Sequence, residues 1–286
     1  MSRKSTLSRI KSGIAAAAIV AFALTGCAPA DNAATDESAL TTITPGKLTI
    51  GTGLPAYAPW VLEDTPESGE GFEAAVAYAI AAELGFAAED VVWVRTTFEE
   101  AIAPGAKNFD FNLQQYTITE ERKANVDFSE AYYVTTQAVV TVKGSAAEGV
   151  TDLAGLKDLL IGAASGTTSF TAVEEIIAPT AGAQAFNSND DAKAALAAGT
   201  IDAIVVDLPT AFFLGSAPAE FGGLDDGLVI GQLSGAGVGD SFGLVLDKGS
   251  SLTAAVSAAI KTLRDNGKLA ELEKKWLTDA GAPVLQ

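Results

Sequence analysis

Histidine is absent from the sequence and cysteine occurs once, which excludes several classes of catalytic site. Without histidine there is no Ser-His-Asp triad, no Cys–His pair and no zinc or facial-triad iron site of the usual kind. Cys27 has no second cysteine with which to form an intramolecular disulfide. Any enzymatic reaction would depend on carboxylates, Lys, Tyr, Ser or Thr, and we expect no metal site and no cofactor.

Positive charge is also scarce, with 18 Lys and Arg against 36 Asp and Glu and a net charge of −18. A field of that sign repels phosphate backbones and excludes nucleic-acid binding by bulk electrostatics. The chain is 48% hydrophobic and only 19% charged, as in globular proteins. Its 286 residues predict two domains or one two-lobed body.

The first 26 residues have the composition of a signal peptide. They contain basic residues but no acid, followed by an apolar run from Ile14 to Leu24 that is shorter than the ~20 residues of a transmembrane helix. Leu24-Thr25-Gly26-Cys27 resembles the bacterial lipobox. We therefore predict a lipoprotein signal peptide over 1–26, lipidation at Cys27 and a flexible tether over 27–45. The alternative is a secretory signal followed by an incidental free cysteine.

Beyond Pro45, strand patterns alternate with helix patterns, which predicts an α/β protein with mainly parallel sheets. Ligands of such sheets bind at the carboxyl ends of the strands, often between lobes. Predicted strands span 47–51, 91–94, 109–113, 137–142, 159–163, 201–206 and 242–246. Predicted helices span 71–84 and 98–103, a third begins within 166–169 and ends at 177, and a fourth runs from a cap at Asp190 to Gly199. A fifth helix starts from a cap at Ser250, and a sixth follows Asn266.

The loop after the first strand matches G-x-G-x-x-A at Gly51–Ala56, but Pro55 and Pro59 prevent the helix start that a dinucleotide site requires. Its aromatic residues Tyr57 and Trp60 are typical of a rigid wall for a small ligand, or of ordinary loop packing.

Three polar features follow later strands. Arg122 lies in the first turn of a helix that Thr119 can cap, and its planar fork suits a carboxylate; the alternative is a surface Arg paired with an acid. Ser165–Ser169 opens a helix whose free N–H groups bind anions, or simply caps it. Asp207 ends an apolar strand and suits an ammonium group, or caps the next helix. Together they fit an α-amino-acid zwitterion.

The order of these motifs is recognisable. KLTIGT, AYAPW, GFEAAVAYAIAAELGF, TITEERKANVDFSEAYY, GTTS and IDAIVVDLPTAF resemble the solute-binding proteins of bacterial amino-acid ABC importers, the family 3 extracellular solute-binding proteins, from about Lys47 to Leu277. The resemblance implies a periplasmic-binding-protein-like fold of type II, with two α/β lobes joined by two crossing segments. Lobe 1 would comprise 46–135 and 240–286, and lobe 2 would comprise 136–239.

The resemblance also assigns ligand-binding residues. Tyr57 and Trp60 would form the aromatic loop over the ligand, Phe98 an apolar wall, Gln115, Thr117 and Asp207 the ammonium side, and Arg122, Thr167, Thr168 and Ser169 the carboxylate side. The chain departs from the family in two segments. The family often has an Asp in the first loop, where this chain has Gly53-Leu54. The chain also has Gln114-Gln115-Tyr116 in a segment whose residues are usually smaller and less polar. We therefore expect an amino acid that is not strongly basic.

The predicted protein is a monomeric, lipid-anchored binding protein at the outer face of the cytoplasmic membrane that delivers an amino acid to an ABC permease and has no catalytic residue. Two alternatives remain. One is a cyclohexadienyl-dehydratase-like enzyme, whose acid would come from Glu63, Asp64 or Glu73, although these are typical of solvated surface. The other is a sensory module for a membrane receptor.

Overall fold

The computed structural model describes residues 40–233, 240–278 and 281–286. The predicted signal peptide, Cys27 and most of the predicted tether lie outside these residues. Within the described ranges no helix is long and apolar enough to cross a membrane.

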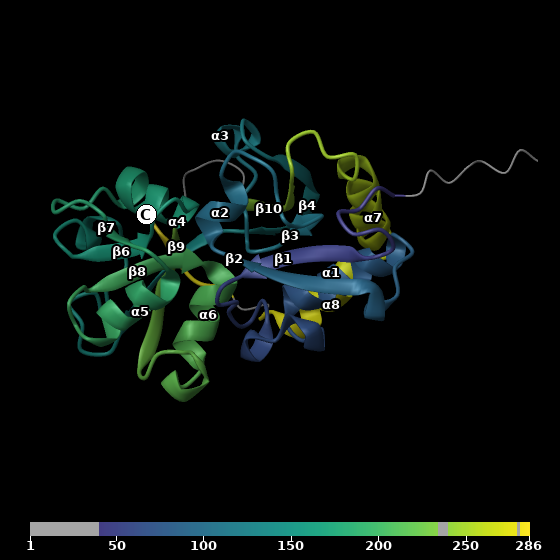
Figure 1. Ribbon diagram of the computed structural model, residues 1–286. Coiled ribbons are helices and arrows are strands. Elements are labelled where there is room, and N and C mark those ends of the chain that lie inside the picture. Colours follow the sequence, from purple (N-terminus) through teal and green to yellow (C-terminus); the bar gives the residue numbers. More distant parts are fainter. Residues whose placement is uncertain (1–39, 234–239, 279–280) are drawn as a thin grey trace, which may run out of the picture. The chain divides into compact units, whose positions relative to one another are not determined.

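Two β-sheets organise the described chain (Figure 1). The first has the order β2-β1-β3-β10-β4, and the second has the order β11-β9-β5-β8-β6-β7. Their strands are β1 (Leu48–Gly53), β2 (Val91–Thr96), β3 (Phe111–Asn112), β4 (Asp127–Thr135), β5 (Gln137–Val142), β6 (Ile161–Ala164), β7 (Gln184–Phe186), β8 (Ala203–Asp207), β9 (Gly227–Leu233), β10 (Asp240–Leu246) and β11 (Val284–Leu285).

Helices accompany both sheets, which confirms the α/β class. They are α1 (Phe72–Glu83), α2 (Phe98–Ile102), α3 (Glu120–Lys123), α4 (Thr168–Ala172), α5 (Asn189–Ala197), α6 (Leu208–Ser216), α7 (Thr253–Asp265) and α8 (Lys268–Trp276), and a π-helical turn over Val173–Ile177 extends α4. Short 3-10 turns complete the connections.

Helix α1 illustrates how the sequence determines the packing. Its apolar residues Phe72, Val76 and Ile80 recur every four positions, so they share one face of the predicted helix, and they are fully buried in the core of the first sheet. The helix begins after Gly71, which has φ 101°, and a Cβ there would lie 2.4 Å from the carbonyl oxygen of Trp60. Glycine is therefore required at this position. Gly85, with φ 86°, follows the end of the helix.

Antiparallel pairs interrupt the parallel order that the sequence predicts. Strand β4 leads into β5 of the other sheet, and β9 of the second sheet precedes β10 of the first. Because the chain leaves the first sheet by one route and returns by the other, β10 pairs antiparallel with β4 and β5 pairs antiparallel with β9. The sheets are therefore mixed, and β4 was not among the predicted strands.

The end of the chain corrects a predicted boundary. Strand β11 pairs in parallel with β9 of the second sheet, so the last residues do not belong to lobe 1. Two helix starts also differ: Ser188 rather than Asp190 caps α5, and α7 begins after Leu252, whose N–H bonds to the Ser250 side chain two residues earlier. The α5 cap is thus a hydroxyl two residues upstream of the expected one, whereas α7 has no side-chain cap and the Ser250 hydroxyl accepts from the turn before it.

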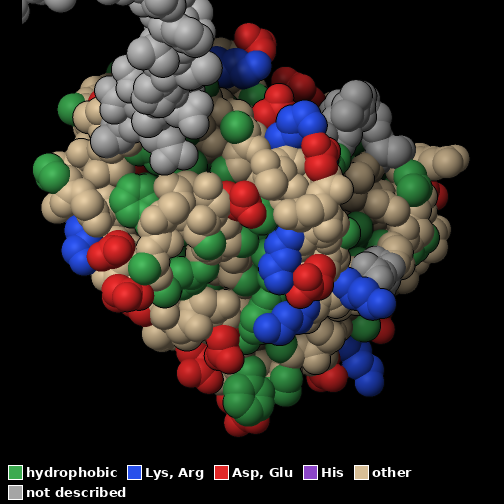
Figure 2. All heavy atoms as spheres, turned by 90° about the vertical axis from the view of Figure 1, so that its right-hand side faces the viewer, with side chains coloured by type: hydrophobic (Ala, Val, Ile, Leu, Met, Phe, Trp, Pro, Cys, Tyr) green, Lys and Arg blue, Asp and Glu red, His purple; other side chains and the backbone are tan. Residues whose placement is uncertain are grey.

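Surface charge is mixed in sign on the face drawn in Figure 2, where Lys and Arg side chains lie beside Asp and Glu. Ion pairs of the exposed surface include Lys261–Asp265 and Arg264–Glu130. Exposed pairs contribute at most about 1 kcal/mol each, so the buried clusters around the two sheets carry the stability.

Candidate functional site

A cavity of about 260 Å³ lies where the carboxyl ends of parallel strands from both sheets meet. On the first side, its lining comes from the segments after β1, β2 and β3 and from α3; on the second side, it comes from the ends of β6, β7 and β8. The lining residues are Leu54, Pro55, Tyr57, Thr97, Phe98, Glu99, Gln114, Gln115, Arg122, Ala164, Ser165, Thr167, Thr168, Ser169, Asn187, Ser188, Asn189 and Asp207. This is the place that the strand order predicts for a ligand.

Arg122 is the cation of this lining, and it is only 8% exposed. The hydroxyl of Thr119 caps α3, as predicted, by accepting from the Arg122 N–H. The guanidinium donates to the carbonyl oxygens of Thr117 at 2.8 Å and Gly166 at 2.9 Å, and lies 5.2 Å from the centroid of the Phe98 ring. Burial lowers its pKa below the usual value. The alternative of a surface Arg paired with an acid is therefore wrong, and the fork keeps further N–H donors for an anion.

The start of α4 supplies hydroxyl groups on the other side. Thr167 caps the helix through the Phe170 N–H, and Ser169 donates to Gln137 Oε1 at 2.6 Å. The Thr168 hydroxyl lies 3.2 Å from that of Thr117. Thr117 thus faces α4 from the first side but does not line the cavity.

Asp207 terminates β8 at the cavity, and its carboxylate does not cap α6. Gln137 Nε2 donates to Asp207 at 2.8 Å and also to Asp240. Burial, reinforced by the negative charge of Asp240, raises the pKa of Asp207 to about 7. A positively charged group in the cavity would favour ionised Asp207.

The expectation that Glu73 is a solvated surface acid is wrong, because the residue is only 2% exposed. Its carboxylate accepts hydrogen bonds from the Gln115 backbone N–H at 2.8 Å, the Gln115 side chain and the Tyr132 hydroxyl. Burial raises its pKa to about 7. A signal in the sequence was the place of Glu73 beside Phe72, at the start of a largely apolar helix. A charge that faces the core there needs hydrogen-bond partners.

The aromatic residues separate into two groups. Tyr57 and Phe98 line the cavity; burial, with the negative charge of Asp190, raises the pKa of Tyr57 to about 12. Trp60 does not line it: the side chain is 1% exposed, packs against the core of the first sheet, and donates to the Thr210 hydroxyl at 2.8 Å. Trp60 therefore links α6 to the first core instead of covering the cavity.

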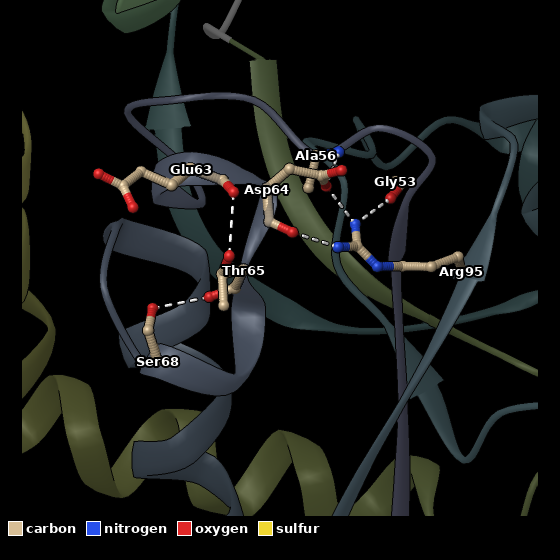
Figure 3. Close-up of polar contacts among 7 residues, drawn as sticks. All are labelled: Gly53, Ala56, Glu63, Asp64, Thr65, Ser68 and Arg95. Carbon is tan, nitrogen blue, oxygen red and sulfur yellow. Dashed lines mark hydrogen bonds and ion pairs between the residues drawn. The ribbon is translucent and has the colours of Figure 1, made fainter.

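Arg95 anchors the loop that carries Tyr57 (Figure 3). Its guanidinium donates to the Gly53 carbonyl at 2.7 Å and to the Asp64 carboxylate at 2.6 Å, and Asp64 also accepts from the Ala56 N–H at 2.8 Å. One side chain thus ties both ends of the loop, although Glu63 and Asp64 have left-handed φ values of 51°. No local pattern predicts this clamp, since Arg95 lies 31 residues beyond Asp64 in the chain.

Comparisons with known proteins agree with this architecture. The model of bacterial extracellular solute-binding proteins, family 3, matches residues 48–279. The L-arginine-binding protein of Pseudomonas aeruginosa is 30% identical over 78% of this chain and 85% of its own length, and the ABC transporter glutamine-binding protein GlnH of Bacillus subtilis is 30% identical over 75% and 76%.

Solved structures show the same fold. An ancestral arginine-binding protein bound to arginine superposes with a TM-score of 0.65 at 28% identity, covering 82% of this chain and 99% of that one. An ancestral amino-acid-binding protein described as a precursor of cyclohexadienyl dehydratase gives a TM-score of 0.65 at 28% identity, covering 82% and 96%. The resemblance seen in the motifs is confirmed: the chain belongs to the family 3 bacterial extracellular solute-binding proteins.

Proposed function

We propose that this chain captures a free α-amino acid in the cavity and delivers it to an ABC permease. The observation that carries the proposal is the shared lining of Arg122, the start of α4 and Asp207. Arg122 and the N–H groups at 167–169 would hold the α-carboxylate, and Asp207 would hold the α-ammonium. Pairing makes burial of both ligand charges tolerable.

The lining favours a polar, uncharged ligand side chain. Carboxamides of Gln114, Gln115, Asn187 and Asn189 line the cavity, and each can donate and accept. Glu99 is the acid that could attract a basic side chain instead. Since relatives are named for arginine and for glutamine, these two amino acids are the informative probes.

Contacts across the two sides support capture by closure. Arg122 bonds to Gly166, Thr117 lies against Thr168, and Trp60 bonds to Thr210. We infer that these contacts form in a closed state that a bridging ligand stabilises over an open one, by a shift in population. We also propose that lipidated Cys27 and the 27–45 tether hold the protein at the outer membrane face beside its permease.

Binding is favoured over catalysis by the places of the two buried acids whose pKa is raised: Glu73 is not in the cavity lining, and Asp207, which is, serves as the partner of the ligand's ammonium group. A dehydratase-like reaction needs an acid that touches the substrate. Gln115 lines the cavity and bonds to Glu73, so it occupies the place where such contact would occur.

A thermal-shift screen of the purified protein against the twenty amino acids tests the proposal. A ligand at 100 times its Kd adds about 2.7 kcal/mol of stability, a shift of several degrees. We expect stabilisation by one or a few amino acids with no product formed. Stabilisation by none of them would overturn the proposal. For the anchor, Cys27→Ser should release the protein from the membrane fraction.

A further inference from the structure

Glu73 is a buried acid of this region for which the proposed binding mode has no use. It lies in the first turn of α1, at the border of a small space also lined by Gly53, Tyr57 and Gln115. It does not line the ligand cavity, but Gln115 lines both spaces. Gln115 is the cavity residue that donates hydrogen bonds to the Glu73 carboxylate, so it connects Glu73 to a ligand in the cavity.

The carboxylate holds Gln115 at two points. Oε1 accepts from the Gln115 backbone N–H at 2.8 Å, and Oε2 accepts from the side-chain Nε2 at 2.5 Å. Gln115 has φ 51°, a left-handed conformation that is energetically unfavourable for any residue other than glycine. Such a conformation persists only where surrounding contacts hold it. The two hydrogen bonds to one carboxylate supply those contacts.

The hydrogen bond from Gln115 Nε2 to Glu73 also determines which end of the Gln115 amide is available to a ligand. The amide nitrogen and oxygen point apart, so with Nε2 bound to Glu73 the carbonyl oxygen is the end that can accept from a ligand N–H. A protonated carboxyl would carry a hydrogen on one oxygen, which then accepts only weakly, so one of the two hydrogen bonds from Gln115 would be weakened. The orientation of Gln115 thus depends on ionised Glu73.

The surroundings of Glu73 make its ionisation sensitive to a ligand. Burial raises its pKa to about 7, and the opposing hydrogen bonds come from the neutral donors Tyr132, on β4, and Gln115. The negative charge of Asp207, on β8, interacts with that of Glu73, and Tyr116 and Tyr57 are the other titratable groups near it. An ammonium group entering the cavity would favour both carboxylates in their ionised forms.

We propose that Glu73 is a positioning residue of the ligand site, which presents the Gln115 carbonyl to the ligand's ammonium group and links binding to its own ionisation. The inference rests on the proposed amino-acid ligand. The opposing view is that Glu73 only completes a buried hydrogen-bond network.

The test compares Glu73→Gln with Glu83→Gln, which makes the same change at the exposed last residue of the same helix. Calorimetric titration with L-glutamine and L-arginine is run from about pH 5.5 to 8.5. For the unaltered protein and the control, affinity should fall as pH falls through about 7, with a slope that reports two carboxyl groups.

For Glu73→Gln we expect affinity at high pH lower by at least about tenfold and a pH profile with the slope of one group, that of Asp207. Glu73→Asp keeps the ionisable group and should keep the two-group slope. An unchanged affinity and an unchanged profile in Glu73→Gln would overturn the proposal.

Two further measurements keep the outcome decisive. If Glu73→Gln does not fold, Tyr132→Phe removes one hydrogen bond that lowers the Glu73 pKa, so the midpoint of the affinity profile should move to higher pH; an unmoved midpoint contradicts the inference. If neither probe binds the unaltered protein, the titrations are run with the amino acid that stabilises it most in the thermal-shift screen, and stabilisation by none of the twenty overturns the proposed function by itself. The positioning role is then decided by hydrogen exchange of the Gln115 amide, which should accelerate in Glu73→Gln but not in Glu83→Gln.

Discussion

Replacing Arg122 by Ala should be the most damaging single change to ligand binding. The side chain is 8% exposed, and its guanidinium is held by carbonyl oxygens from both sides of the cavity. Removing one partner of a buried, hydrogen-bonded charge pair costs about 2–5 kcal/mol, because the other charge is left without compensation. A loss of about 3 kcal/mol corresponds to a Kd more than 100-fold higher.

The assay is calorimetric titration of the amino acid identified in the thermal-shift screen. Arg122→Lys should fall between the unaltered protein and Arg122→Ala, since an ammonium group keeps the charge but lacks the planar fork. Arg264→Ala is the matched control: it truncates an exposed guanidinium on α7, which is not part of the cavity. If Arg122→Ala binds within about threefold of the unaltered protein, the assignment of the carboxylate to Arg122 is refuted.

Three more outcomes follow from the structure. Because the pKa of Glu73 is raised from 4.5 to about 7, its stabilising effect is complete below pH 4.5 and is lost as pH rises through 7. Urea unfolding of the ligand-free protein should show this loss as up to about 3 kcal/mol of the fall in stability over that range, and Glu73→Gln should remove it while the fall caused by the raised pKa of Asp207 remains. Arg95→Ala should release the loop that carries Tyr57 and raise Kd several-fold while Tm changes by only a few degrees, as measured by calorimetry and thermal unfolding; equal Kd values would contradict the clamp. Thr210→Val leaves the buried Trp60 N–H without its acceptor, at a cost of about 1–3 kcal/mol, so Kd should rise at least about fivefold while Thr210→Ser restores binding.

Much of the fold could be predicted because its signals are local. The four-residue spacing of Phe72, Val76 and Ile80 identifies α1, and the apolar run before Asp207 identifies β8. Strand β4 lacks such a signal, since Asp127–Thr135 mixes polar, aromatic and apolar residues. The place of β11 depends on pairing with β9, more than fifty residues earlier, which no local pattern encodes.

The site divides in the same way. Arg122, Asp207 and the start of α4 line the cavity because each follows the carboxyl end of a strand or begins a helix, and both positions can be identified from the sequence. Trp60 could not be placed, because a Trp on a loop packs equally well inward or over a ligand. The environment of Glu73 depends on Gln115 and Tyr132, which come from other elements.

The most direct test of the account is a crystal structure of the protein with the amino acid that stabilises it most in the screen. We expect the α-carboxylate within hydrogen-bond distance of the Arg122 guanidinium and the N–H groups at 167–169, and the α-ammonium against Asp207. A ligand seated in the cavity with its ammonium away from Asp207, or bound elsewhere on the protein, would contradict it.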